Sequence, residues 1–363
     1  MIKKTLWLFV ICLMLPAKNG RAWGEIYQQI VDTYVYTTSA EDLAIAALKG
    51  LNKVDGKLNV GNDSSRITLY FDGKVVEVLR KPEKNDYKKW GDITEKMIEA
   101  AIESSRKASS RDFEITDILA QEAVKILDKD SKFFANEDEA AFVNLRNKRL
   151  FAARVENEVL FLRVAAFNKQ TFAEIKTALS EYSSAKALII DLRNCPGGMP
   201  GEAIKTVDLF LDSGIIASSK GRSDTEETFY TADEDIIWKN KPIFILVDGE
   251  TASAAEILAA AMKDQGLAQI IGTKTKGKGT MQKLIGLKTG AVLAITNGFF
   301  KTPSGKNIDN VAIRPNVCTF EMPENKNIEN LLGQQDGVCL SENREDGVLE
   351  EKVAEFIINE TFN

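Results

Sequence analysis

Residues 241–282 read KPIFILVDGETASAAEILAAAMKDQGLAQIIGTKTKGKGTMQ, and this stretch decides the expected fold. The apolar run from Ile243 to Val247 predicts a buried strand, and a helix is expected to begin near Ser253. A second short strand and a glycine-rich loop carrying Lys278 follow. A small hydroxyl at the start of a helix that follows a buried strand is held exposed and near backbone N–H donors. Ser253 is therefore the candidate nucleophile.

From Phe151 onward, strand-like apolar runs alternate with helical ones. The expected strands are Val159 to Val164, Ala187 to Leu192 and Ile243 to Val247, and the expected helices are Phe172 to Tyr182, Glu202 to Leu211 and Ala254 to Met262. This alternation predicts an α/β domain with a largely parallel sheet. In such sheets, sites form at the carboxyl ends of the strands.

Residues 23–150 are expected to form a mainly helical region that contains one β-hairpin. Helical spacing of apolar residues recurs three times, and Asp72-Gly73 lies between two strand-like runs, a good signal for a two-residue turn. Because no catalytic pattern is visible in this region, we interpret it as scaffold.

Two turns at expected strand ends carry candidate residues, and each also has a purely structural interpretation. In DLRNCPGG the two glycines, Gly197 and Gly198, serve a tight turn or bring a backbone N–H to a developing oxyanion. In GETASAAE, Ser253 and Glu256 fit a helix capping box. Neither turn by itself distinguishes structure from chemistry.

The loop GTKTKGKGTMQ supplies the candidate partner of Ser253. Glycines flank Lys278, so its amine can be covered and desolvated, and a neutral amine is a competent general base for a serine hydroxyl. Gln282 is placed to orient that amine. A solvated loop lysine is the structural alternative. A phosphate loop is disfavoured, because Gly279 stands where its hydroxyl residue belongs and a strand, not a helix, is expected to follow.

The chain contains no histidine, which excludes a Ser-His-Asp triad, a Cys-His dyad and a histidine metal centre within this polypeptide. No Cys-x-x-Cys pair is present either. We therefore expect no metal and no cofactor, and any base for Ser253 must be another kind of residue.

The first 22 residues, MIKKTLWLFVICLMLPAKNGRA, have the pattern of an export signal cleaved after Ala22. A membrane anchor is the alternative, but Pro16 and Lys18 interrupt the apolar run, so no stable membrane span is expected after signal removal. We expect an exported protein, in the periplasm or, as the alternative, secreted. With a net charge of −6, nucleic acid is not expected as a partner.

Export makes the cysteines informative. Cys195, Cys318 and Cys339 remain after the signal, and in an oxidising compartment Cys318 and Cys339 are candidates for a disulfide. Pairing does not follow from spacing, so it stays open. Cys195 lies beside the candidate oxyanion loop. It is either a residue that only packs in the core or an oxidisable thiol.

The motifs occur together in a recognisable order: DLRNCPGG, TASAAEILAAAMKD, GTKTKGKGTMQ, FFKTPSGKNID and IRPNV. This combination resembles the C-terminal processing (tail-specific) peptidases, serine peptidases with a Ser/Lys dyad. The resemblance covers about residues 151–317, with a fainter match at ILDKDSKFF. It implies a ClpP/crotonase-like catalytic core and an exported endopeptidase that cleaves near C-termini or in unfolded proteins through an acyl-enzyme.

Carried over position by position, the resemblance implies roles for five residues. Ser253 would be the nucleophile, Lys278 the general base and Gln282 the residue that orients the lysine. The backbone N–H groups of Gly198 and Ala254 would form the oxyanion hole. The alternative is a catalytically idle module on the same scaffold that binds apolar ligands or proteins.

The resemblance also implies a substrate-reading PDZ module, which this chain has no room for. Such a module would stand between Phe134 and Phe161, where too few residues lie for a domain. We expect a signal at 1–22, a helical domain at 23–150, the catalytic domain at 151–320 and a tail with a terminal helix at 321–363. Polypeptides are the expected partners, and the helical domain is a candidate for adaptor binding or self-association.

Overall fold

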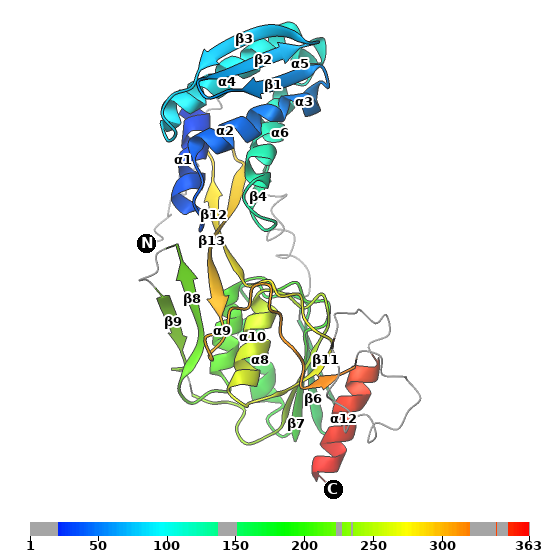
Figure 1. The fold of residues 1–363 in the computed structure, drawn as a ribbon. Coiled ribbons are helices and arrows are strands. Elements are labelled where there is room, and N and C mark those ends of the chain that lie inside the picture. The colour runs from blue at the N-terminus through cyan, green and yellow to red at the C-terminus, as the bar shows by residue number, and fades with distance from the viewer. Residues whose placement is uncertain are drawn as a thin grey trace, which may run out of the picture. The chain divides into compact units, whose positions relative to one another are not determined.

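The computed structural model describes residues 21–136, 151–222, 227–233, 235–319, 339 and 348–362. The expected signal peptide lies almost wholly outside these residues. The chain divides into two compact units: unit 1 comprises residues 1–32 and 37–129, and unit 2 comprises residues 33–36 and 130–363. Each unit has its own elements (Figure 1).

Unit 1 combines helices with a small antiparallel sheet of order β1-β2-β3. Its elements are α1 (Arg21–Thr33), α2 (Ala40–Lys49), α3 (Leu51–Val54), β1 (Leu58–Asn62), β2 (Arg66–Phe71), β3 (Lys74–Arg80), α4 (Tyr87–Ser104), α5 (Arg106–Ser110) and α6 (Asp112–Lys125). Asp72 and Gly73 join β2 to β3, both with positive φ, as a two-residue turn between antiparallel strands requires. β1 was not expected, because glycine and asparagine weaken its strand pattern.

Unit 2 contains two sheets and the helices that cover them. Its elements are β4 (Lys132–Phe134), β5 (Phe151–Glu156), β6 (Val159–Val164), α8 (Thr171–Glu181), β7 (Ala187–Asp191), α9 (Pro200–Asp208), β8 (Ile215–Gly221), β9 (Glu227–Thr231), β10 (Ile243–Val247), α10 (Ala254–Asp264), β11 (Gln269–Gly272), β12 (Thr280–Gly286), β13 (Val292–Lys301), β14 (Val317–Cys318) and α12 (Val348–Phe362). One sheet has the order β14-β11-β10-β7-β6-β5, and the other contains β12-β13-β8-β9 with β4 paired to β13.

The six-stranded sheet is parallel from β6 to β14, with only β5 antiparallel. Its inner strands β6, β7 and β10 are buried on both faces, which explains why β10 reads as a continuous apolar run. One face packs against α8, α9 and α10, and the other packs against α12 (Figure 1). The sheet therefore lies between two layers of helix.

Parallel pairing brings the carboxyl ends of neighbouring strands to one edge. Leu246 of β10 lies opposite Asp191 of β7, and Val247 lies opposite Gly272 of β11. The three loops that carry the candidate residues leave the sheet at these ends. Strand register thus places the oxyanion loop, the Ser253 turn and the Lys278 loop side by side.

Candidate functional site

Ser253 lies in a strained turn between β10 and α10. Its φ of 56° and ψ of −118° are rare for a residue with a side chain, and such strain persists only where the surroundings enforce it. The residue is half-buried while its neighbours Ala252 and Ala254 are buried. Its hydroxyl makes no side-chain cap hydrogen bond to the described residues, although it faces the Glu256 N–H in a capping-box arrangement. The turn therefore holds a serine hydroxyl at the N-terminus of a helix.

Glu256 ties this turn to the Lys278 loop. One of its carboxylate oxygens accepts the backbone N–H of Ser253 at 2.9 Å and that of Lys278 at 2.8 Å. The other accepts the Thr275 hydroxyl at 2.6 Å and the Gly277 N–H at 2.7 Å. Because one oxygen bridges both backbones, the candidate nucleophile and the candidate base are fastened to a single side chain.

The Glu256 carboxyl is fully buried, and burial raises its pKa while its hydrogen bonds to Thr275 and to the loop N–H groups act in the opposite direction. The capping-box interpretation captured only part of its role. Ser253 and Glu256 do have the capping-box arrangement, but only the carboxylate half has full hydrogen-bond geometry. A glutamate within the otherwise apolar run from Ala254 to Met262 is the signal that points to its wider role.

The expected oxyanion loop packs directly against the Ser253 turn. Phe167 pairs with the loop on either side of Gly198: its N–H donates to the Gly197 carbonyl at 2.8 Å, and its carbonyl accepts the Met199 N–H at 2.9 Å. Neither Gly198 nor Ala254 donates its backbone N–H to any described residue. A Cβ at Gly197 would lie 2.8 Å from the Ala254 nitrogen, so the two backbones touch.

Asp248 and Cys195 hold the same turn in place through backbone hydrogen bonds. The Asp248 carboxylate accepts the N–H of Asn194, at 3.0 and 2.9 Å, and that of Thr251 at 2.9 Å. The Cys195 carbonyl accepts the Ala252 N–H at 2.9 Å. The Cys195 thiol is free and buried, and burial raises its pKa to about 12. Cys195 therefore packs in the core as a protonated thiol at neutral pH.

The DLR segment is fixed by an ion-pair network with the C-terminal helix. Arg193 contacts Asp191 at 2.9 Å, and it also contacts Glu350 at 3.2 Å and Glu351 at 2.9 Å on α12. Glu350 in turn accepts the Thr319 hydroxyl at 2.7 Å. The cysteines at 318 and 339 form a disulfide, which resolves the pairing that spacing left open.

The Lys278 loop is closely packed along its backbone. A Cβ at Gly279 would lie 2.2 Å from the Asp309 nitrogen, so only glycine fits there. The Lys276 N–H also donates to the Thr251 carbonyl at 3.0 Å. The side chain of Lys278 is 33% exposed and lies 3.7 Å from Asp130. The backbone of the loop is therefore closely packed, whereas the Lys278 amine is partly exposed and lies near Asp130, an acid that the sequence did not point to.

Gln282 is close to this region but is not bonded to Lys278. Its side-chain amide donates to the Thr280 hydroxyl at 2.8 Å. It lies on β12, next to a register shift between Met281 and Gln282. The structure thus joins Ser253, Ala254, Gly198 and the Lys278 backbone at one edge, while Gln282 engages a neighbour on its own strand.

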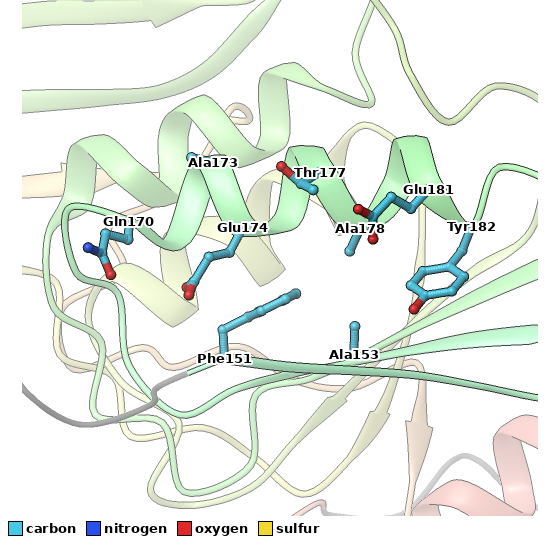
Figure 2. A pocket seen from close by; sticks show the side chains of 9 residues that line it. All are labelled: Phe151, Ala153, Gln170, Ala173, Glu174, Thr177, Ala178, Glu181 and Tyr182. Carbon is cyan, nitrogen blue, oxygen red and sulfur yellow. The ribbon is translucent and has the colours of Figure 1, made fainter.

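A cavity of about 520 Å³ lies elsewhere in unit 2, between β5 and α8. Figure 2 shows Phe151 and Ala153 of β5 facing Glu174 and Tyr182 of the α8 region across it. None of the five candidate residues lines this cavity. Within the described ranges, no cluster of three or more metal-ligating side chains occurs, and no helix is long and apolar enough to cross a membrane.

A serine held in a strained strand-to-helix turn at the carboxyl edge of a parallel sheet, beside unengaged backbone donors, is the arrangement of a serine hydrolase. Residues 158–319 match Peptidase family S41. This match covers the candidate site, and the resemblance to the C-terminal processing peptidases is confirmed.

Curated relatives support this assignment over the same region. The carboxy-terminal-processing protease of Bartonella bacilliformis is 35% identical over 191 residues, which cover 50% of this chain and 44% of that protein. The carboxyl-terminal-processing protease of Synechocystis is 35% identical over 165 residues, covering 45% of this chain and 38% of that protein. The chain thus spans less than half the length of these relatives.

Among solved structures, the photosystem II D1 C-terminal processing protease is similar, with 31% sequence identity and a TM-score of 0.41. The similarity covers 44% of this chain and 42% of that one.

Proposed function

We propose that this protein is a serine endopeptidase that cleaves polypeptides near their C-termini or in unfolded chains. Ser253 is the nucleophile, Lys278 the general base and Gln282 the residue that orients the lysine, on a ClpP/crotonase-like core. The observation that carries the proposal is the strained Ser253 turn, joined to the Lys278 backbone through one buried carboxylate oxygen.

In the proposed reaction, neutral Lys278 accepts the proton of the Ser253 hydroxyl as its oxygen attacks the substrate carbonyl. The resulting ammonium returns the proton to the departing amine when the peptide bond breaks. Water, activated by the same neutral lysine, then hydrolyses the acyl-enzyme and regenerates the serine. No histidine is needed at any step, in agreement with its absence from the chain.

The tetrahedral intermediate places negative charge on the former carbonyl oxygen. The backbone N–H groups of Gly198 and Ala254 are the proposed donors to it, because both lack an acceptor among the described residues and their loops are in contact. The N-terminus of α10 adds a partial positive charge at the same place.

The proposal includes export to the periplasm. The pattern of residues 1–22 supports it, and so does the disulfide between Cys318 and Cys339, since disulfides persist in oxidising compartments. Polypeptides are the proposed substrates, and unit 1 is the proposed region for adaptor binding or self-association. N-terminal sequencing of the protein recovered from a periplasmic fraction tests export, and recovery of an intact residue 1 contradicts signal cleavage.

The catalytic assignment is tested with an unfolded protein substrate and a fluorophosphonate probe. Ser253→Ala and Lys278→Ala are each expected to lower the cleavage rate by roughly a thousandfold or more, because each removes a member of a cooperating set. Lys276→Ala is the matched control: Lys276 lies in the same loop, is exposed and pairs with Glu250, so its loss leaves cleavage intact. Cleavage at the parent rate by either catalytic variant contradicts the assignment.

A further inference from the structure

Asp130 lies beside the amine that the proposed mechanism uses as a base. Its Oδ1 is 3.7 Å from the Nζ of Lys278, and the Asp130 side chain is only 11% exposed. Asp130 belongs to the segment just before β4, far from Lys278 in the sequence. Among the described residues, it is the acid that forms an ion pair with Lys278.

The second oxygen of Asp130 joins the same contact to Gln282. The Thr280 hydroxyl donates to Asp130 Oδ2 at 3.0 Å, and the Gln282 amide donates to that same hydroxyl at 2.8 Å. Lys278, Asp130, Thr280 and Gln282 therefore form one continuous polar chain. In this series of contacts Asp130 lies between Lys278, the proposed base, and Gln282, the residue proposed to orient it.

Backbone and side-chain contacts of the residues that follow Asp130 hold it in place. Ser131, the next residue, accepts the Thr296 N–H at 3.1 Å through its hydroxyl. β4 then pairs with β13, with Lys132 opposite Ala294. The position of Asp130 is therefore set by the second sheet of unit 2.

The other charged groups of the loop are engaged differently. Glu256 of α10 accepts the backbone N–H of Lys278, and Glu250, in the turn before α10, pairs with Lys276. From the segment after β13, Asp309 meets the loop through its backbone at Gly279. Asp130 is thus the carboxylate positioned to act on the Lys278 ammonium.

A carboxylate next to an amine favours its charged form, whereas the proposed mechanism needs the neutral one. We propose that Asp130 is a positioning residue that holds Lys278 in a protonated resting state by competing with Gln282 for its amine. Activity then requires Lys278 to leave Asp130 and contact Gln282. This inference rests on the proposed role of Lys278 as general base.

The direct test observes Lys278 without catalysis. In the full chain carrying Ser253→Ala, lysines are methylated with ¹³C-formaldehyde, and the Lys278 signal is assigned by its loss in Lys278→Arg. Asp130→Asn keeps the shape of the side chain and removes its charge, so the NMR titration midpoint of Lys278 is expected to fall. An unchanged or higher midpoint overturns the proposal, whether or not the protein is a peptidase.

The second readout is the pH dependence of Ser253 labelling by a fluorophosphonate. In Asp130→Asn the rising limb is expected to move to lower pH, with labelling at pH 7 about three- to tenfold faster. Asp130→Glu, which keeps the charge, is expected to retain the parent profile. Slower labelling with an unmoved limb shows a merely structural role and overturns the proposal.

Circular dichroism checks that each variant is folded. Asp130→Ser is the second neutral substitution if Asp130→Asn does not fold, and the same shift is expected from it. Failure of the parent protein to label at any pH contradicts the proposed peptidase function, while the NMR titration still decides the role of Asp130.

Discussion

The Ser253 turn and the Lys278–Gln282 segment lie at the same edge of the sheet but are held in different ways. The turn is fixed through backbone N–H groups that donate to the buried carboxylates of Asp248 and Glu256. The Lys278 and Gln282 side chains are half-buried, and their partners are the side chains of Asp130 and Thr280.

This difference separates what is rigid in the proposed site from what is adjustable. Backbone hydrogen bonds to buried carboxylates leave few alternative geometries, so the proposed nucleophile and the proposed oxyanion donors are preorganised. A half-exposed lysine has other partners within rotamer reach at small cost. Control of the proposed activity is therefore expected at the proposed base, Lys278. The following variants test the rigid side, which is the Ser253 turn, from the largest expected effect to the smallest.

Glu256→Gln is expected to disturb the geometry of the Ser253 turn more than any other variant. Glutamine has only one acceptor oxygen, so its amide must face backbone or hydroxyl donors and leave some of them unpaired, at about 1 to 3 kcal/mol for each. We expect fluorophosphonate labelling to fall roughly a hundredfold, because positioning of both proposed catalytic groups is lost. Glu250→Gln, at an exposed ion pair in the adjoining turn, is the control. Parent-rate labelling in Glu256→Gln contradicts the proposal that Glu256 positions Ser253 and Lys278.

Gly197→Ala tests the contact between the oxyanion loop and the serine turn. The residue has a φ of 94°, and its new Cβ would lie 2.6 Å from the Ala252 carbonyl oxygen and 2.8 Å from the Ala254 nitrogen. We expect about tenfold slower labelling and a loss of roughly 1 to 3 kcal/mol in unfolding free energy, because a backbone must shift. Gly201→Ala, where a Cβ meets nothing within 4 Å, is the matched control. Equal effects in both variants contradict close packing as the cause.

Removing the disulfide is expected to separate stability from catalysis. The double variant Cys318→Ala, Cys339→Ala opens a bridge between residues 21 apart and is expected to lower the unfolding free energy by about 2 to 4 kcal/mol in urea denaturation. Labelling of Ser253 is expected to stay within about twofold of the parent, since both cysteines lie against Gly272 of β11 and outside the Ser253 turn. A large loss of labelling in the folded variant places the C-terminal segment in control of the site.

Cys195 is expected to be inert in the native state. Burial raises the pKa of its thiol to about 12, compared with about 8.5 in the unfolded chain. The contribution of the protonated thiol to the free energy of unfolding is therefore fully present below about pH 8.5. It is lost only as the pH rises towards the folded-state value. Native protein is therefore expected to resist iodoacetamide at pH 8 and to react fully in urea, as measured by mass spectrometry. Rapid alkylation of the native protein indicates that the oxyanion loop opens.

Much of this protein followed from the sequence by itself. Apolar periodicity predicted β6, β10 and the three helices between β6 and β11, because buried parallel strands and amphipathic helices leave local patterns. The absence of histidine and the spacing of Ser253, Lys278 and Gln282 pointed to a Ser/Lys peptidase, and Peptidase family S41 matches over that region. Their catalytic roles remain predictions that the proposed variants test.

Only the tertiary structure decided which groups surround those residues. The bridge from Glu256 to the Lys278 loop, the approach of Asp130 to Lys278 and the pairing of Cys318 with Cys339 all join residues that are distant in the chain. Local patterns carry no information about such contacts, because strand register and loop packing set them. The strained φ of Ser253 has the same origin, since the surrounding backbone enforces it against the preference of serine.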